Sequence, residues 1–400
     1  MFTTIIINVD ELWLKGKNRK SYSDALRKHV RDILSSYLDT KWTIRNDQQR
    51  FVCDCEAGFN DDVIKRLCDI PGLHSVLKVR KCEKDLNKAV DLVIADLKLR
   101  TDISTFKVQS KRVDKSFPTQ SRELNLHFGG AILKNTHLKV DVHNPDITVE
   151  VKILNEHIYL SWEKHYGIGG LPVNTSGHVV TLISGGFDSP VASYLMSRRG
   201  CKQTFAFFYA YPYVGEEVKD KIVKMCQILS KFQNGAKLYV IPFGNVQNFI
   251  SNECYEEYRT LFFRKYMMDV ASKLADKIKA EAILMGDSLA QVSSQTLHNM
   301  AALDKSCDKL VLRPLLGNNK LDIIALSKKI GTHDTSIIPH DDACSLFAPK
   351  HPITKPKMEY FNKFINKFPC TELIDECIEN AEVFSFNNRL MIKDSNFTKN

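Results

Sequence analysis

The segment Ser184-Gly-Gly-Phe-Asp-Ser189 has the residue types and spacing of a loop that binds phosphate. It follows a continuous apolar run at residues 179–183 and precedes an apolar-periodic stretch that begins near Pro190. Glycines let a backbone turn tightly and approach oxyanions, while backbone N–H groups, serine hydroxyls and the positive end of a helix attract phosphate. No Gly-Lys-Ser/Thr follows, as a Walker loop requires, and the spacing is not that of a dinucleotide-binding loop. We therefore expect a strand, a phosphate cradle of another kind and a helix, in that order.

Asp188 needs a partner in such a loop, because an unpaired carboxylate repels phosphate. A bridging Mg²⁺ would reverse the local electrostatics and would make Asp188 a catalytic residue. The alternative is that its carboxylate caps the N-terminus of the helix, and the two roles can coexist. The sequence thus predicts Mg²⁺ at this loop, and we assign no set of metal ligands elsewhere in the chain.

The 11 cysteines are odd in number and scattered, and no C-x-x-C occurs among them. This pattern argues against a disulfide framework. One tight pair, Cys53-x-Cys55, has no second pair or nearby histidine to complete a zinc site. We expect most thiols to be reduced and many to be buried, with one active thiol as the interesting possibility.

Charge and composition indicate a globular protein that could bind a polyanion. Hydrophobic residues make up 44% and charged residues 26%, and the formal net charge is +9. No apolar run approaches the roughly 20 residues of a membrane span, and the first residues lack the pattern of a secretory signal. We therefore expect a cytoplasmic protein without a membrane partner. Two basic groups could contact phosphates, although a charge run is usually a solvated face; they are Lys107, Lys111, Arg112, Lys115 and Arg122, and Lys15, Lys17, Arg19 and Lys20.

The elements that would position these residues fall into three regions. Residues 1–75 alternate strand and helix patterns over a short span, which indicates a small α+β domain. Residues 76–172 repeat this mixture and end in Gly167-Ile-Gly-Gly-Leu-Pro172, the clearest linker in the chain. Residues 173–400 alternate apolar strands with helices, which predicts a doubly wound α/β domain with a parallel sheet. Beyond about Phe384 the chain becomes polar, and we expect a loose tail.

The loop at Ser184–Ser189 also resembles the PP-loop of ATP pyrophosphatases, which cleave ATP between its α and β phosphates. Further motifs resemble one family, the tRNA 4-thiouridine synthetases or tRNA sulfurtransferases: Leu14-Lys-Gly-Lys-Asn-Arg19, the basic stretch 106–118, Gly169-Gly-Leu-Pro172, Gly286-Asp-Ser-Leu-Ala-Gln-Val-Ser-Ser-Gln-Thr296 and Cys344-Ser-Leu-Phe-Ala-Pro-Lys-His-Pro352. The match spans nearly the whole chain in the same order. It implies a ferredoxin-like domain at 1–75, a THUMP RNA-binding domain at 76–172 and a PP-loop domain at 173–400.

The resemblance implies an activity and its partners. The family uses ATP to convert uridine 8 of tRNA to 4-thiouridine, and some members are linked to sulfur delivery for the thiazole of thiamine. Cys344 matches the cysteine that carries the persulfide; nearby Lys350 would favour its thiolate, whereas Asp341 and Asp342 would not unless they bind Mg²⁺ or turn outward. Longer members add a rhodanese-like domain. Because this chain ends at Asn400, we expect the short form, with Cys344 itself loaded by a cysteine desulfurase, and a homodimer as a possible assembly.

The family's ATP contacts map by position onto this chain. Many relatives have His-Phe where this chain has Phe207-Phe208, and a stacking or backbone contact to adenine survives that change. Arg264 would meet phosphate, unless it is only salt-bridged, and Gly286 would allow close approach to the nucleotide. The expected ATP-binding residues are Leu182, Ile183, Ser184, Gly185, Gly186, Ser189, Phe207, Phe208, Arg264, Gly286 and Gln295.

Two other functions are compatible with parts of the sequence. A PP-loop ligase that adds ammonia or an amine, as in NAD or GMP synthesis, would need neither a thiol nor an RNA domain, and no glutaminase motif is visible. The Cys344→Ser variant would retain such an activity. A non-enzymatic RNA-binding or chaperone role would leave the phosphate loop unexplained, and Asp188→Ala would not affect it.

Overall fold

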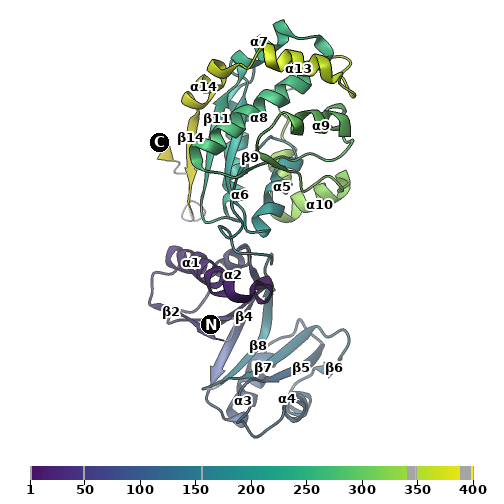
Figure 1. Ribbon diagram of the computed structural model, residues 1–400. Coiled ribbons are helices and arrows are strands. Elements are labelled where there is room, and N and C mark those ends of the chain that lie inside the picture. The colour runs from purple at the N-terminus through teal and green to yellow at the C-terminus, as the bar shows by residue number, and fades with distance from the viewer. Residues whose placement is uncertain are drawn as a thin grey trace. The chain divides into compact units, whose positions relative to one another are not determined.

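The computed structural model describes residues 2–47, 50–154, 156–339, 347, 349–387 and 398–399. The chain forms two compact units, Met1–Gly169 and Gly170–Asn400 (Figure 1). The division falls inside the glycine-rich stretch 167–172. Among the described residues, no helix is both long and apolar enough to cross a membrane.

One mixed sheet of eight strands runs through the whole first unit, in the order β2-β3-β1-β4-β8-β7-β5-β6. Strand β4 joins its two halves, because it pairs with β1 on one side and with β8 on the other. The strands are β1 (Thr4–Val9), β2 (Trp42–Asp47), β3 (Arg50–Cys55), β4 (Leu73–Cys82), β5 (Thr105–Arg112), β6 (Lys139–Val140), β7 (Ile147–Ile153) and β8 (Ile158–Tyr166).

Two pairs of helices cover separate parts of this sheet. Helices α1 (Arg19–Tyr37) and α2 (Asp61–Cys68) bury their apolar faces on β1, β3 and β4, while α3 (Leu86–Leu97) and α4 (Ser121–Asn135) pack on β5, β7 and β8 (Figure 1). A 3₁₀ segment, η1 (Glu11–Asn18), precedes α1. Local caps define the helix starts: the side chain of Asn60 accepts a hydrogen bond from the backbone N–H of Val63.

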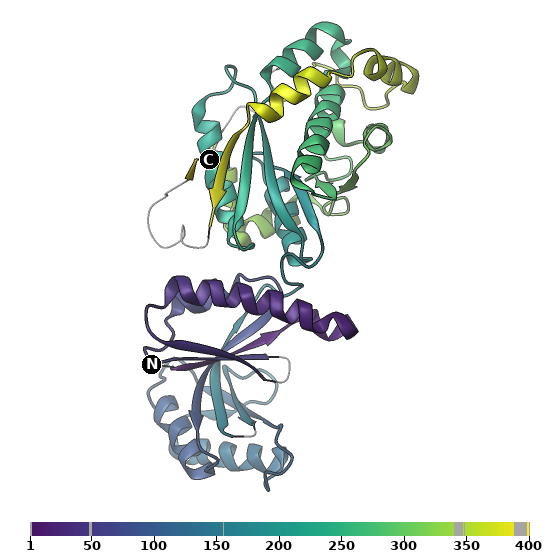
Figure 2. The same cartoon turned by 60° about the vertical axis from the view of Figure 1, so that its left-hand side comes forward.

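The second unit contains a seven-stranded sheet in the order β13-β12-β9-β10-β11-β14-β15. Five strands are parallel, as predicted, but β14 pairs antiparallel with β11, and β15 pairs antiparallel with β14 (Figure 2). Pairing to β11 therefore orders the chain as far as Phe386, whereas most of the tail that the sequence suggested was loose lies outside the described residues. The strands are β9 (His178–Leu182), β10 (Lys202–Tyr209), β11 (Ala236–Pro242), β12 (Ala282–Leu284), β13 (Leu310–Leu312), β14 (Glu382–Phe386) and β15 (Thr398–Lys399).

Helices lie on both faces of this sheet, as a doubly wound domain requires (Figure 2). One face carries α5 (Asp188–Arg198), α6 (Glu216–Ser230), α10 (Lys320–Ile330) and α11 (His333–Ser336). The other carries the long, largely buried α8 (Arg259–Ile278), with α7 (Gly244–Glu253), α9 (Leu297–Lys305), α13 (Met358–Lys367) and α14 (Thr371–Glu379) around it. Short 3₁₀ turns, η2 (Glu256–Tyr258) and η3 (Ser293–Gln295), precede α8 and α9.

Candidate functional site

A cavity of about 400 Å³ opens in the second unit at the carboxyl ends of β9, β10 and β12. This is the edge at which open α/β sheets bind ligands, and the volume lies in the usual range for small-molecule pockets. Asp188 and all but one of the predicted ATP-binding residues line it; Gly185 is the exception. The remaining lining residues were not predicted as site residues, although three of them, Asp287, Val292 and Ser294, belong to the quoted 286–296 motif; the other three are Thr260, Met267 and Met285.

The phosphate loop is tied to the first turn of α5 by its two serines. The backbone N–H of Ser184 donates to Oγ of Ser189 at 2.9 Å, and the two hydroxyls lie 3.1 Å apart. Helix α5 begins at Asp188, two residues before the expected start. Pro190 still lies in the first turn, where its missing N–H removes no helical hydrogen bond.

The Asp188 carboxylate does not cap the helix, since Phe187 occupies the cap position and makes no side-chain cap bond. It instead meets Lys320, the first residue of α10, whose Nζ donates to the two carboxylate oxygens at 2.8 and 3.0 Å. The Nε2 of Gln291 donates to the same carboxylate at 3.0 Å. A lysine and an amide are therefore partners of the Asp188 carboxylate.

Neither partner of Asp188 was predicted as a site residue. Gln291 lies inside the quoted 286–296 motif, whereas Lys320 belongs to no motif and stands 132 positions away from Asp188. Among the described residues, no group of three or more histidine, cysteine, aspartate or glutamate side chains could hold a metal ion. Mg²⁺ commonly uses one carboxylate together with substrate phosphates, and Asp188 fits that donor set.

Gly286 lies directly against the phosphate loop. A Cβ atom at this position would lie 2.6 Å from the backbone nitrogen of Ser189 and 2.7 Å from its Cα. The close approach at Gly286 is therefore to the backbone of α5, in addition to any contact with a nucleotide. Any larger residue would push the loop away from β12.

Arg264 is held by a buried carboxylate. Its Nη2 donates to both oxygens of Asp287 at 2.7 and 2.6 Å, and its Nη1 donates to the carbonyl of Ser294 at 2.7 Å. Its side chain is only 9% exposed. The salt-bridged alternative therefore describes Arg264 in this structure, although the same side chain also lines the cavity.

Phe207 and Phe208 are both buried near the end of β10 and both line the cavity. The Phe208 ring packs edge-on against Phe243 at a centroid distance of 5.0 Å and belongs to the core around α8. These residues are therefore part of the core and of the cavity wall at once. Such an apolar wall suits a flat heterocycle such as a purine.

Cys344, with its neighbours His340, Asp341 and Asp342, lies outside the described residues. The chain before it ends at α11, where Oγ of Ser336 donates to the carbonyl of Gly186 in the phosphate loop. The buried Lys221 donates to the carbonyls of Ser336 and Ile338 at 3.1 and 2.7 Å. The described chain leading to Cys344 is thus attached to the wall of the cavity.

After Cys344, the ring of Phe347 packs edge-on against Tyr213 and Phe263, with centroid distances of 5.2 and 6.1 Å. Phe263 precedes Arg264 on α8. Residues on both sides of the Cys344 segment therefore contact elements that line the cavity.

Burial makes most of the other thiols poor nucleophiles, because it disfavours the thiolate. It raises the pKa of Cys82 to about 11 and that of Cys68 to about 12. Burial also raises the pKa of six further thiols: Cys53, Cys201, Cys226, Cys254, Cys370 and Cys377. These eight cysteines are protonated at neutral pH.

The predicted tRNA-binding residues gather around β5 and the start of α4 in the first unit. Lys107 and Lys111 alternate with Phe106 of the core, so they lie on the sheet face away from α3 and α4. Arg112 donates to the carbonyl of Phe117 at 2.8 Å and so also shapes the loop that follows. Three members of the group are exposed: Lys111, Lys115 and Arg122.

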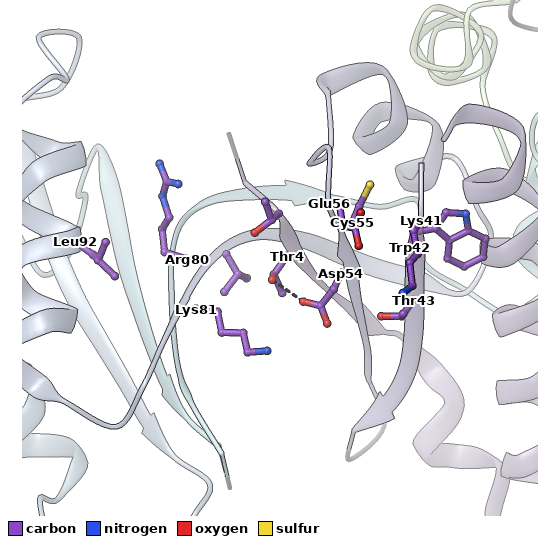
Figure 3. A pocket seen from close by; sticks show the side chains of 12 residues that line it. Thr4, Lys41, Trp42, Thr43, Asp54, Cys55, Glu56, Arg80, Lys81 and Leu92 are labelled. Carbon is purple, nitrogen blue, oxygen red and sulfur yellow. Dashed lines mark hydrogen bonds between the residues drawn. The ribbon is translucent and has the colours of Figure 1, made fainter. Parts of the chain in front are cut away.

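The first unit also contains a hollow of about 640 Å³ (Figure 3). Arg80 and Lys81 of β4 are on one side of it, and Cys55 and Glu56 at the end of β3 are on the other, with the hydrogen-bonded pair Thr4 and Asp54 between them. None of the five predicted tRNA-binding residues lines it. A smaller hollow is lined by part of the second basic group: Lys17, Arg19 and Lys20.

Comparison with family models divides the chain into three segments. Residues 4–76 match the ThiI ferredoxin-like domain, residues 80–163 match the THUMP domain, and residues 174–369 match the family described as thiamine biosynthesis protein (ThiI). These matches confirm the predicted fold classes: a ferredoxin-like and a THUMP domain share the sheet of the first unit, and the second unit is the PP-loop domain.

Individual proteins resemble the chain over almost its full length. It is 37% identical to a probable tRNA sulfurtransferase of Thermoanaerobacter sp. strain X514 over 372 residues, covering 93% of this chain and 97% of the relative. It is 36% identical to a probable tRNA sulfurtransferase of Alkaliphilus oremlandii over 388 residues, covering 96% and 98%. The crystal structure of a 4-thiouridine synthetase–RNA complex with bound ATP superposes with a TM-score of 0.87 at 29% identity, covering 97% of this chain and 100% of that one.

Proposed function

Because the chain belongs to the tRNA sulfurtransferase family, we propose that it is an ATP-dependent enzyme that converts uridine 8 of tRNA to 4-thiouridine. The observation that carries this proposal is the cavity beside the phosphate loop, which brings together residues from β9, β10, α8 and the 286–296 segment. No ammonia ligase or RNA chaperone needs this cavity together with a THUMP domain. The family description also supports a link to sulfur delivery for the thiazole of thiamine.

In the first step, the protein binds ATP and activates the base. The apolar wall with Phe207 and Phe208 takes the purine, and the phosphate loop takes the β and γ phosphates. The O4 of uridine 8 attacks the α-phosphorus, an O–P bond forms, and pyrophosphate leaves. The N-terminus of α5 and Lys320 stabilise the leaving group's charge. Mg²⁺, held by Asp188 and the phosphates of ATP, would supply further charge neutralisation.

In the second step, sulfur replaces the activated oxygen. A persulfide on Cys344 attacks C4 of the adenylated base, and AMP leaves with its electron pair. A thiol, either a second cysteine or an external reductant, then cleaves the sulfur–sulfur bond that joins Cys344 to the base. This releases 4-thiouridine and leaves Cys344 in a disulfide with that thiol. Cysteine desulfurase supplies the next persulfide after reduction.

Transfer RNA contacts the enzyme through its phosphate backbone and through its target base. We propose that Lys107, Lys111 and Lys115 meet backbone phosphates, which position the RNA without reading its sequence; the exposure of Lys111 and Lys115 supports this. The target base must leave its stack to enter the cavity. The protein's contribution is chiefly positioning and charge neutralisation.

The Cys344→Ser variant tests the assignment. With ATP, tRNA and a persulfide donor, it should release pyrophosphate but form no 4-thiouridine, since activation needs the loop and transfer needs the thiol. Cys307→Ser is a matched control in the same unit and should give wild-type product in a single turnover. Nucleoside mass spectrometry measures the product per enzyme.

Two results would contradict different parts of this proposal. Thionucleoside at wild-type yield from Cys344→Ser would remove Cys344 from the sulfur path. If the wild-type enzyme releases no pyrophosphate with ATP and tRNA, the proposed function itself is wrong.

A further inference from the structure

The carboxylate of Asp287 is the centre of a buried network at one end of the cavity. Its side chain is 7% exposed and lies just beyond the end of β12. Arg264 binds both of its oxygens, and Nε of Arg313 donates to one of them at 2.9 Å. The Nε2 of Gln295 reaches the carboxylate at 3.3 Å. One anion therefore organises three side chains from three separate segments.

Two of these three partners line the cavity, and the third does not. Arg264 and Gln295 line it and were predicted as nucleotide contacts, whereas Arg313 does not line it. Arg313 is in turn bound by Asp304, which accepts two hydrogen bonds at 2.9 and 2.7 Å. The network thus has a side that faces the nucleotide and a side that faces the protein.

The charges in this network require the carboxylate. Arg264 and Arg313 are 9% and 5% exposed, and two guanidinium groups at that depth repel one another without an anion between them. Burial alone would raise the pKa of Asp287, but the attraction of Arg264 and the bonds from Arg313 outweigh it and lower that pKa. The carboxylate is therefore ionised at neutral pH, and it balances the charge that Arg264 brings to the cavity wall.

We propose that Asp287 is a positioning residue of the ATP site, which holds Arg264 and Gln295 in the places where they meet the nucleotide. This inference rests on the proposed function. It also describes how charge is distributed within the site: Arg264 is paired with Asp287, and Lys320, beside the phosphate loop, is paired with Asp188. Because Gly286 touches the phosphate loop and Asp287 follows it, one short segment aligns both ends of the cavity.

The test compares two partners of the same network. Asp287→Asn keeps the size of the side chain and removes its charge. Loss of one partner of a buried charge pair is costly, so the dissociation constant and KM for ATP should both rise about tenfold or more, with kcat changing less than about threefold. Arg313→Gln is the matched control, because it removes another bond to Asp287 outside the cavity. It should lower the thermal stability but leave ATP affinity within about threefold of wild type.

The binding measurement uses ATP alone, without tRNA, by calorimetry on the full chain. If Asp287→Asn binds ATP as the wild type does, or if Arg313→Gln weakens ATP equally, Asp287 is only structural and the inference is wrong. If Asp287→Asn fails to fold, the double variant Asp287→Asn/Arg313→Gln replaces it, because this variant removes one charge of each sign. The double variant should fold and should still bind ATP weakly. Normal ATP affinity in the double variant would overturn the inference. If instead the wild type binds ATP but releases no pyrophosphate in the presence of tRNA, the proposed function is wrong. That result is distinct from a failure of the inference about Asp287.

Discussion

Replacing Lys320 with methionine should slow activation of tRNA, because it removes a cation that pairs with Asp188 next to the phosphates. Nζ of Lys320 lies 2.8 Å from the Asp188 carboxylate. Two unit charges about 4 Å apart interact by about 4 kcal/mol at an effective dielectric constant of about 20. The Lys320 side chain is 42% exposed, so solvent screening reduces this to about 2 kcal/mol. A barrier higher by that amount slows the reaction on the order of 30-fold.

The assay is tRNA-dependent pyrophosphate release at varied ATP concentration. We expect Lys320→Met to lose about 30-fold in kcat/KM for ATP, with unchanged tRNA affinity, and Lys320→Arg to retain part of the activity because it keeps the charge. Lys329→Met is the control, since Lys329 is an exposed lysine in the last turn of the same helix. Kinetics of Lys320→Met within about threefold of wild type would refute this account of the loop's electrostatics.

Two further predictions concern the other surfaces of the enzyme. Changing Lys107, Lys111 and Lys115 together to glutamine should weaken tRNA binding and leave ATP affinity unchanged. The slope of log affinity against log salt concentration should fall in magnitude by roughly two to three. An unaltered slope would show that these lysines form a solvated surface that does not contact RNA. Gly286→Ala would place a Cβ 2.6 Å from the Ser189 nitrogen, so it should cost about 1–3 kcal/mol of stability and weaken ATP binding. Wild-type melting temperature and ATP affinity in that variant would contradict the packing of β12 on the loop.

The phosphate loop could be predicted from the sequence because it is one contiguous segment. A strand, two glycines, two serines and a proline define it without help from the rest of the chain. Its partners could not be predicted in the same way. Lys320 reaches Asp188 from 132 positions away, and only the fold brings them together. The Asp287 network likewise joins residues from α8, the 286–296 motif and the segment after β13.

Strands β4 and β13 were not predicted from the sequence, and the burial of one and the length of the other explain why. Strand β4 begins directly after Pro71-Gly72, and five consecutive residues from Ser75 to Val79 are buried. Burial on both faces removes the polar alternation that identifies a strand. Strand β13 has only three residues, too few for a period to be visible. Helices α1, α3 and α4 have 19, 12 and 15 residues, which is long enough for a helical period to be visible in a sequence.

The shared strand β4 has a consequence for how the protein folds and how it can be dissected. Because β4 is hydrogen-bonded to β1 and to β8, the two halves of the first unit cannot unfold independently without breaking a ladder in the middle of a sheet. A fragment cut near residue 75 would expose β1 on one side of the cut and β4 on the other as unprotected edges, which favours aggregation. Residues up to Gly169 therefore constitute one cooperative folding unit, although their sequence matches two different domain families.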